Sequence, residues 1–207
     1  MMRMNRFGRW LMNSPQRAYL QRRYLMPTYE RLGAKFDNAR VLEVGCGRGI
    51  GMNLIKRAGA ARVDGADLDP VMANLARRRL AGRMLVFVAD IAALPIPNAT
   101  YDVVVDFGAI HLMPEWRTAV AEVARVLRPG GRFLFEQPAH RVYRLVMPLS
   151  TSRRIPGGFT RAAFLAELAE CGFRETTLIR PRFLALTGIL GDVVGVAVRS
   201  PVSYGKA

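Results

Sequence analysis

The sequence predicts an α/β fold built around a mostly parallel sheet, and three observations predict it. An apolar pair, Val41-Leu42, runs into a glycine-rich turn at residues 43–49 that opens a helix. Candidate strands that end at or near an acid then recur at residues 62–67, 84–91 and 101–106. Segments with helical patterns separate these candidates, and strands that alternate with helices are typical of parallel sheets.

The turn after the first strand presents bare backbone to a ligand. Glycines stand at positions 45, 47, 49 and 51, and glycine tolerates a positive φ and has no Cβ. The helix that follows offers its N-terminal N–H groups. A dinucleotide-binding turn requires G-x-G-x-x-G, whose third residue is small, but this chain has Ile50 there. The turn therefore favours a nucleoside ligand over a dinucleotide.

A carboxylate ends the second strand. Asp67 lies 22 residues after Gly45, where it can accept hydrogen bonds from both ribose hydroxyls. Dinucleotide folds place an acid at a similar distance, so Asp67 supports a nucleoside without choosing the cofactor. Asp69 is predicted to cap the next helix, with Pro70 in its first turn. Leu68 is placed either to contact an adenine or to be an ordinary core leucine.

The later strands follow the same plan. The third, Met84–Ile91, is an apolar strand closed by the carboxylate of Asp90, which by itself reads as a turn cap. The fourth, Tyr101–Asp106, leads into Phe107. A helix from about Trp116 to Leu127, a turn at 128–131 and a strand at 132–136 complete the parallel series.

Taken together, these motifs resemble those of class I S-adenosylmethionine-dependent methyltransferases. The first motif of that family, E/D-x-G-x-G-x-G, matches residues 43–49, and the phrase YDVVVD…LRPGG matches residues 101–131. The resemblance covers residues 38–136 strongly and residues 157–199 loosely. It implies a Rossmann-like three-layer sandwich with a seven-stranded, mostly parallel sheet whose last strand is antiparallel. The implied cofactor is S-adenosyl-L-methionine, and the implied product is S-adenosyl-L-homocysteine.

The resemblance also implies a cofactor site. Glu43 would hold the methionine amino end, Asp67 the ribose, and Asp90 with the backbone of Ile91 the adenine. The predicted cofactor-binding residues are Glu43, Gly45, Cys46, Gly47, Gly49, Asp67, Leu68, Asp90, Ile91, Asp106 and Phe107. No metal site is predicted, because two cysteines suggest neither a disulfide framework nor a multi-ligand metal cluster.

His111 is the predicted catalytic base, since imidazole titrates in the useful range. A base is needed only if the acceptor has a proton that must leave. The alternative for His111 is a structural role within its loop, and His140 is a weaker second choice. Glu136 either faces the acceptor or is a buried, paired carboxylate.

Positive charge is concentrated outside these motifs. The formal net charge is +15; residues 1–40 hold nine bases and two acids, and residues 137–161 hold five bases and no acid. Both segments mix bases with large apolar side chains, which fits a membrane surface or an anionic amphiphilic acceptor. The alternative is that the apolar faces dock on the domain and the arginines are merely solvated. Tyr19, Arg23 and Tyr24 are candidates to close over the methionine carboxylate.

We expect a single methyltransferase domain over residues 1–207. Its parts are a basic amphipathic helical segment (1–37), the cofactor-binding core (38–136), a basic substrate-side insertion (137–160) and a C-terminal helix and hairpin (161–207). Thr160 is the predicted N-cap of the helix at 161–170. Strands at 175–180 and 193–199 form the predicted hairpin, and Gly191-Asp192 is predicted as a turn before the last strand.

The predicted activity is in-line transfer of a methyl group to a small or amphiphilic acceptor. The alternatives are a membrane-surface lipid or quinone methyltransferase and, less favoured, an RNA methyltransferase, a nicotinamide oxidoreductase or a non-catalytic cofactor-binding module. Nucleic acid is disfavoured because Phe107-Gly108-Ala109 stands where base-modifying relatives have an N-P-P-Y-like segment.

The predicted location is the cytoplasm, with peripheral contact at the inner membrane surface as the alternative. The start of the chain is a poor signal peptide, and the apolar stretch at 183–198 is too short and broken to span a bilayer. The sequence fixes neither the oligomeric state nor the acceptor atom.

Overall fold

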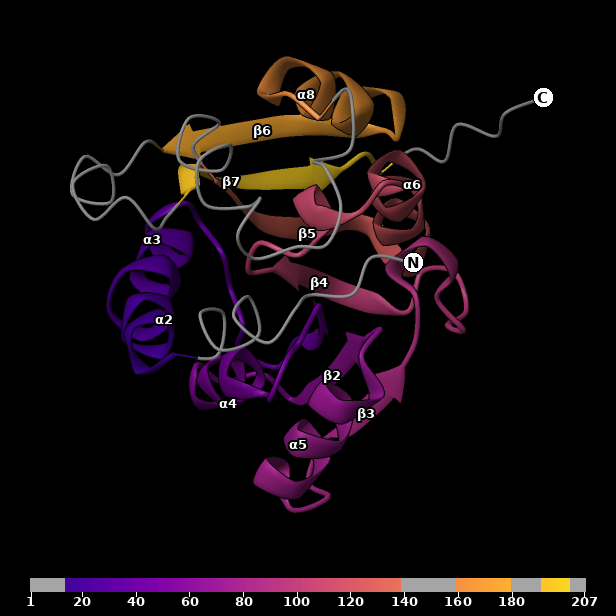
Figure 1. The fold of residues 1–207 in the computed structure, drawn as a ribbon. Helices are drawn as coiled ribbons and strands as arrows, with labels where there is room; N and C mark the ends of the chain where they lie inside the picture. The colour runs from indigo at the N-terminus through magenta and orange to yellow at the C-terminus, as the bar shows by residue number, and fades with distance from the viewer. Residues whose placement is uncertain (1–13, 139–158, 180–190, 202–207) are drawn as a thin grey trace.

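The computed structural model describes residues 14–138, 159–179 and 191–201, which form a seven-stranded sheet in the order β3-β2-β1-β4-β5-β7-β6 (Figure 1). The strands are β1 (Arg40–Val44), β2 (Arg62–Asp67), β3 (Leu85–Val88), β4 (Tyr101–Asp106), β5 (Leu127–Pro138), β6 (Phe173–Ile179) and β7 (Gly191–Arg199). Strands β1 to β5 pair in parallel, and β7 is antiparallel to both of its neighbours. The predicted sheet is confirmed, including its antiparallel last strand.

Helices cover both faces of this sheet. The α-helices are α2 (Pro15–Leu20), α3 (Met26–Arg31), α4 (Ile50–Arg57), α5 (Pro70–Leu80), α6 (Trp116–Val126) and α8 (Arg161–Glu170). Residues of α3, α4 and α5 share one buried cluster with Val103 and Val105 of β4. Residues of α6 and α8 share the other with Val104. Because successive strand side chains point to opposite faces, this alternation makes three layers, as predicted.

The chain changes direction around β1, and this positions the site. From β1 it runs outward through β2 to β3 and then returns to place β4 on the other side of β1. The order of parallel strands therefore reverses between β1 and β4. Open α/β sheets bind ligands at such a point, outside the carboxyl ends of the strands.

One nearly continuous helical run precedes the sheet. Helix α2 begins after Ser14, whose hydroxyl accepts from the backbone N–H of Arg17 at 3.2 Å. A π-helical turn, η1 (Gln21–Leu25), joins α2 to α3. Pro27 lies in the first turn of α3 and has no N–H to donate, which accounts for the widened turn before it. Residues 1–13 of the predicted N-terminal segment lie outside the described residues.

The C-terminal part agrees with the prediction except at one turn. Thr160 is the N-cap of α8, and its hydroxyl accepts from the N–H of Ala163 at 3.1 Å. The turn predicted at Gly191-Asp192 is wrong, because β7 already begins at Gly191, which pairs with Pro138 of β5. Most of the predicted insertion at 137–160 lies outside the described residues.

Two other boundaries differ from the expected ones for local reasons. Strand β3 ends earlier than expected because Asp90 caps a short helical turn, η2 (Ile91–Ala93). Strand β5 begins earlier, at Leu127, and its pairing with β4 skips from Leu127 to Arg132 across the predicted turn. Within the described ranges, no helix is long and apolar enough to cross a membrane.

Candidate active site

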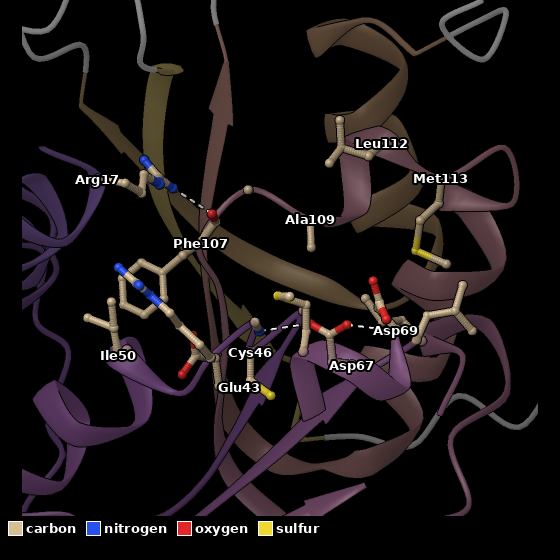
Figure 2. A pocket seen from close by; sticks show the side chains of 18 of the residues that line it. Arg17, Glu43, Cys46, Ile50, Asp67, Asp69, Phe107, Ala109, Leu112 and Met113 are labelled. Atoms are coloured by element: carbon tan, nitrogen blue, oxygen red, sulfur yellow. Dashed lines mark hydrogen bonds between the residues drawn. The ribbon is translucent and has the colours of Figure 1, made fainter. Parts of the chain in front are cut away.

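A cavity of about 280 Å³ lies at the carboxyl ends of β1, β2, β3 and β4. Glu43 and Cys46 come from the end of β1 and its turn, Asp67 ends β2, and Phe107 follows β4. Figure 2 shows Ile50 and Phe107 at one end of the cavity and Asp69 and Met113 at the other. The cavity is thus elongated across the strand ends, between the glycine turn and the loop after β4.

The glycine turn has the backbone that its sequence predicts. Gly45, Gly47 and Gly49 have φ angles of 67°, 52° and 77°, in the left-handed region that favours glycine. A Cβ at position 45 would lie 2.2 Å from the Cβ of Ala109. The loops after β1 and β4 can therefore approach this closely only because residue 45 has no side chain.

Glu43 is the most notable polar group of the cavity. The residue is 1% exposed, and its carboxylate accepts from the backbone of Met52 while Oε2 has no hydrogen-bond partner within the described chain. Burial, together with the nearby charge of Asp67, raises the pKa of Glu43 well above its usual range. A buried carboxylate oxygen without a partner is costly, so a cationic donor in the cavity would be bound strongly there.

Asp67 ties the glycine turn to β2. Its Oδ2 accepts from the N–H of Gly47 at 2.7 Å, and its Oδ1 accepts from the N–H of Asp69 at 2.9 Å. These bonds orient the carboxylate and leave each oxygen a second acceptor site for a ligand hydroxyl. Asp90 also lines the cavity, and its Oδ1 accepts from the N–H of Ala92 at 2.9 Å as the cap of η2.

Nine of the predicted cofactor-binding residues line this one cavity. They are Glu43, Gly45, Cys46, Gly47, Asp67, Leu68, Asp90, Ile91 and Phe107. Gly49, Asp106 and His111 do not line it. Gly49 instead begins α4 and contacts α5, since a Cβ there would lie 3.1 Å from Leu80.

Asp106, which was predicted to bind the cofactor, lies behind the loop that follows β4. It is fully buried and accepts from the N–H of Ala109 at 2.5 Å and from that of Ile110 at 3.3 Å. Burial raises the pKa of Asp106 to about 7, against the opposing effect of these N–H donors. Its visible role is to shape the turn that presents Phe107 and Ala109 to the cavity.

The N-terminal helices contribute residues that the sequence did not reveal. Arg17 and Ala18 of α2 and Gln21 of η1 line the cavity, whereas Tyr19 is 57% exposed and Arg23 is exposed. None of Tyr19, Arg23 and Tyr24, the candidates to close over the methionine carboxylate, lines the cavity. Arg17 gives no sequence signal, because the acid that pairs with it is 119 residues away.

That acid is Glu136 at the end of β5. Both Nη atoms of Arg17 donate to its carboxylate, the Nη1 bond being 3.1 Å, and Nη2 also donates to the carbonyl of Phe107 at 2.6 Å (Figure 2). Of the two alternatives for Glu136, the buried, paired carboxylate is the one observed. One ion pair thus fastens α2 over the cavity.

The cavity does not favour covalent chemistry. Cys46 is its only sulfhydryl group among the described residues that line it, and burial, with the charge of Glu43, raises the pKa of this thiol. The thiolate form that would be nucleophilic is therefore suppressed.

Across the described ranges of the chain, no group of three or more His, Cys, Asp or Glu side chains is arranged to hold a metal ion.

Comparison with known families identifies this arrangement. Residues 42–135 match the sequence model of the family described as "Methyltransferase domain". Over these residues the chain is similar to the methyltransferase domain of S-adenosylmethionine-dependent methyltransferases. This similarity implies S-adenosylmethionine as the cofactor. The buried carboxylate oxygen of Glu43 that has no partner within the described chain, beside a glycine turn without side chains, fits such a cationic nucleoside.

Two curated relatives match this methyltransferase domain. The fatty-acid O-methyltransferase of Mycolicibacterium smegmatis is 41% identical over 117 residues, which is 55% of this chain and 43% of the relative. The phthiotriol/phenolphthiotriol dimycocerosates methyltransferase of Mycobacterium leprae is 34% identical over 145 residues, which is 68% of this chain and 52% of the relative. The chain thus spans about half the length of these relatives.

The solved structures show the same fold. An S-adenosylmethionine-dependent methyltransferase from Mesorhizobium loti superposes with a TM-score of 0.68, covering 91% of this chain and all of that one. The sequence identity is 19%, so this likeness shows the architecture alone.

Gly51 is expected to be needed for the shape of the cavity around Glu43. A Cβ at position 51 would lie 2.4 Å from Oε1 of Glu43 and 2.6 Å from the ring of Phe107. Gly51→Ala should therefore displace the Glu43 carboxylate and weaken S-adenosylhomocysteine binding by about tenfold, roughly the loss of one charged hydrogen bond. Calorimetric titration measures this; an unchanged Kd would show that the carboxylate does not contact the ligand.

His111 is expected to make folding sensitive to acid. Burial, aided by the charge of Arg17, lowers its pKa to about 3. In the unfolded chain this imidazole binds a proton below about pH 6.5, whereas in the folded chain it stays neutral down to about pH 3. The free energy of unfolding is therefore highest above about pH 6.5 and decreases as the pH falls towards 3. This linkage costs the wild type about 2 kcal/mol at pH 5. Measured by denaturant unfolding, the free energy of unfolding of His111→Gln should decrease less than that of the wild type between pH 7 and pH 5. The same decrease in both proteins would contradict this prediction.

Proposed function

We propose that this chain transfers the methyl group of S-adenosylmethionine to an oxygen of a lipid-class acceptor, with a long-chain carboxylate as the first candidate. The observation on which this depends is the composition of the cavity wall. Its described lining contains acids, arginines and aliphatic or aromatic side chains, but no histidine, lysine or tyrosine. A carboxylate acceptor needs no base, because it has no proton to lose at neutral pH.

The cofactor would lie along the strand ends. Glu43 would accept from the methionine amino group, and the backbone of the glycine turn would leave room for the chain between sulfur and ribose. Asp67 would accept from the ribose hydroxyls with its remaining acceptor sites. Leu68, Asp90, Ile91 and Met113 would surround the adenine at the other end of the cavity.

The protein's task is mainly alignment. A bound S-adenosylmethionine would supply a methyl group on a positively charged sulfur that can leave as a neutral thioether, so the residues around it would mainly have to hold the acceptor oxygen in line. The wall formed by Arg17, Ala18 and Gln21 would exclude water and restrict the approach of the acceptor. Glu43 would offset the positive charge of the methionine end.

The names of the relatives support a lipid-class acceptor. One relative is named for fatty acids and the other for phthiotriol dimycocerosates. The basic segments at 1–40 and 137–161 would suit an anionic amphiphile by charge. The role predicted for His111 as a base stays a prediction; if it holds, His111→Gln lowers turnover much more than cofactor affinity.

The test is a transfer assay with cofactor labelled in the methyl group. The purified chain is incubated separately with fatty acids, hydroxylated lipids, small polar metabolites and RNA, and label is counted in each product. We expect label in the fatty-acid arm, released by mild base as expected for a methyl ester. Label in the metabolite or RNA arm alone would overturn the lipid assignment, and label in hydroxylated lipids alone would overturn the carboxylate.

A further inference from the structure

Most of the exposed aliphatic surface of the described chain lies at one edge of the sheet. Six large hydrophobic side chains are exposed in the described part of the chain, and four of them belong to α5 or β3. The exposed fractions are 51% for Val71, 36% for Leu75, 47% for Leu85 and 46% for Val88. Figure 1 shows α5 and β3 together at the end of the sheet opposite α8 and β6. Such a concentration of apolar groups is typical of an interaction surface.

The charge of this edge has one sign. Residues 70–89, which include all of α5 and β3, hold four arginines and no acid. Val71 and Leu75 are one helical turn apart, and Arg78 and Arg79 follow Leu75 by three and four residues, so the four share a face of α5. All four are exposed. This face therefore combines aliphatic side chains with guanidinium groups.

The backbone of this edge is not open to a further strand along its whole length. Arg77 of α5 donates to the carbonyl of Val86 in β3, at 2.7 Å from Nη2 and 3.2 Å from Nε. Because this carbonyl is already bonded to a side chain of α5, part of the hydrogen-bonding edge that a further strand would need is covered. The edge is thus better suited to a lipid surface than to strand pairing with a second copy of the chain.

The same helix reaches the cofactor cavity. Asp69, the cap of α5, and Met72 in its first turn both line the cavity. Arg48 of the glycine turn also lines it, and its pKa is lowered by partial burial and by the nearby charge of Arg79. The basic face of α5 therefore adjoins the part of the molecule where a cofactor would bind.

We propose that the α5–β3 face, defined as Val71, Leu75, Arg78, Arg79 and Val88, docks on an anionic lipid surface. Aliphatic side chains would enter the headgroup region while guanidinium groups pair with lipid phosphates. The proposal rests on the proposed function only in that docking would bring a lipid acceptor to the cavity; the docking itself needs no turnover.

Vesicle co-sedimentation tests the proposal with two matched variants of the full chain. Arg78→Glu with Arg79→Glu reverses two adjacent arginines on this face, and Arg22→Glu with Arg23→Glu reverses two exposed adjacent arginines in η1. Both change the net charge equally. We expect the wild type to bind phosphatidylglycerol vesicles and not phosphatidylcholine vesicles. The α5 variant should bind at least ~10-fold more weakly, and the η1 variant within twofold of the wild type.

A second pair of measurements separates the apolar contribution and the competing partner. Val71→Ser with Leu75→Ser should also weaken vesicle binding, whereas Tyr19→Ser, another exposed position, should not. Light scattering should give the mass of one chain, 23.0 kDa. A dimer that the α5 variant dissociates, equal binding to both vesicle types, or an equal loss in the η1 variant would each overturn the proposal.

Failure of the surface and failure of the proposed function give different results. With a fatty acid presented in detergent micelles, the Val71→Ser with Leu75→Ser variant should transfer methyl groups at the wild-type rate, because neither residue lines the cavity. Selective vesicle binding without transfer to any lipid would overturn the function and leave the surface. Transfer to lipid with no selective binding would overturn the surface alone.

Discussion

Arg17→Met is expected to lower the free energy of unfolding by about 3–5 kcal/mol, the usual cost of leaving one partner of a buried ion pair uncompensated. The side chains of Arg17 and Glu136 are 8% and 3% exposed, so water cannot replace the lost partner. For a chain of this size, the loss corresponds to roughly 10 °C in Tm. Glu136→Gln should have an effect of similar size.

The double variant Arg17→Met with Glu136→Leu separates the cost of one unpaired buried charge from the contribution of the ion pair itself. It should be more stable than either single variant, because no buried charge is left alone. The exposed pair of Arg128 and Asp102, with side chains 45% and 34% exposed, is the matched control, and Arg128→Met should cost no more than about 1 kcal/mol. Denaturant unfolding gives all of these values. A loss below 1 kcal/mol for Arg17→Met would show that the pair does not hold α2 in place.

Glu43→Gln is expected to weaken S-adenosylhomocysteine binding by roughly 10- to 100-fold, about the strength of a hydrogen bond between charged groups. The fold should survive, because the substitution removes a buried charge whose pKa is already raised by burial and by Asp67. Calorimetric titration measures the affinity, and a thermal melt measures the stability. Glu175→Gln, an exposed change of the same chemistry on β6, is the control.

The pH dependence of binding distinguishes a direct contact from a packing effect. The amino group of the ligand would stabilise the charged form of Glu43, so its raised pKa should fall on binding and a proton should be released. Wild-type affinity should therefore rise with pH up to the raised pKa of Glu43 in the free protein and level off above it. Glu43→Gln should lose that dependence. The same slope in both proteins would place the effect on another group.

The sequence predicted those parts of the molecule that depend on local pattern. The glycine turn after β1 was predicted from residues whose positive φ angles only glycine tolerates well, and Asp67 was predicted from its place at the end of a short strand. The caps Asp69 and Thr160 were predicted because a capping side chain acts on its own helix. These features need only the few residues around them.

The parts that the sequence missed depend on contacts across the chain. Arg17 could not be chosen from its neighbours, because only the folded sheet brings it to Glu136 and to the carbonyl of Phe107. Asp106 ends a strand just as Asp67 does, yet it is fully buried behind the turn to which it is bonded and does not line the cavity. The α5–β3 face could not be predicted from net charge. Its four arginines lie within the segment 41–136, where bases and acids nearly balance, and only the folded helix places Arg78 and Arg79 beside exposed aliphatic side chains.

The crystal structure of the chain with S-adenosylhomocysteine is the most direct test of the central claim. We predict the ligand across the ends of β1, β2 and β3, its amino group on Glu43, its ribose hydroxyls on Asp67 and its adenine beside Asp90. Ligand bound at any other site, or strand ends closed by side chains with no room for it, would contradict the account.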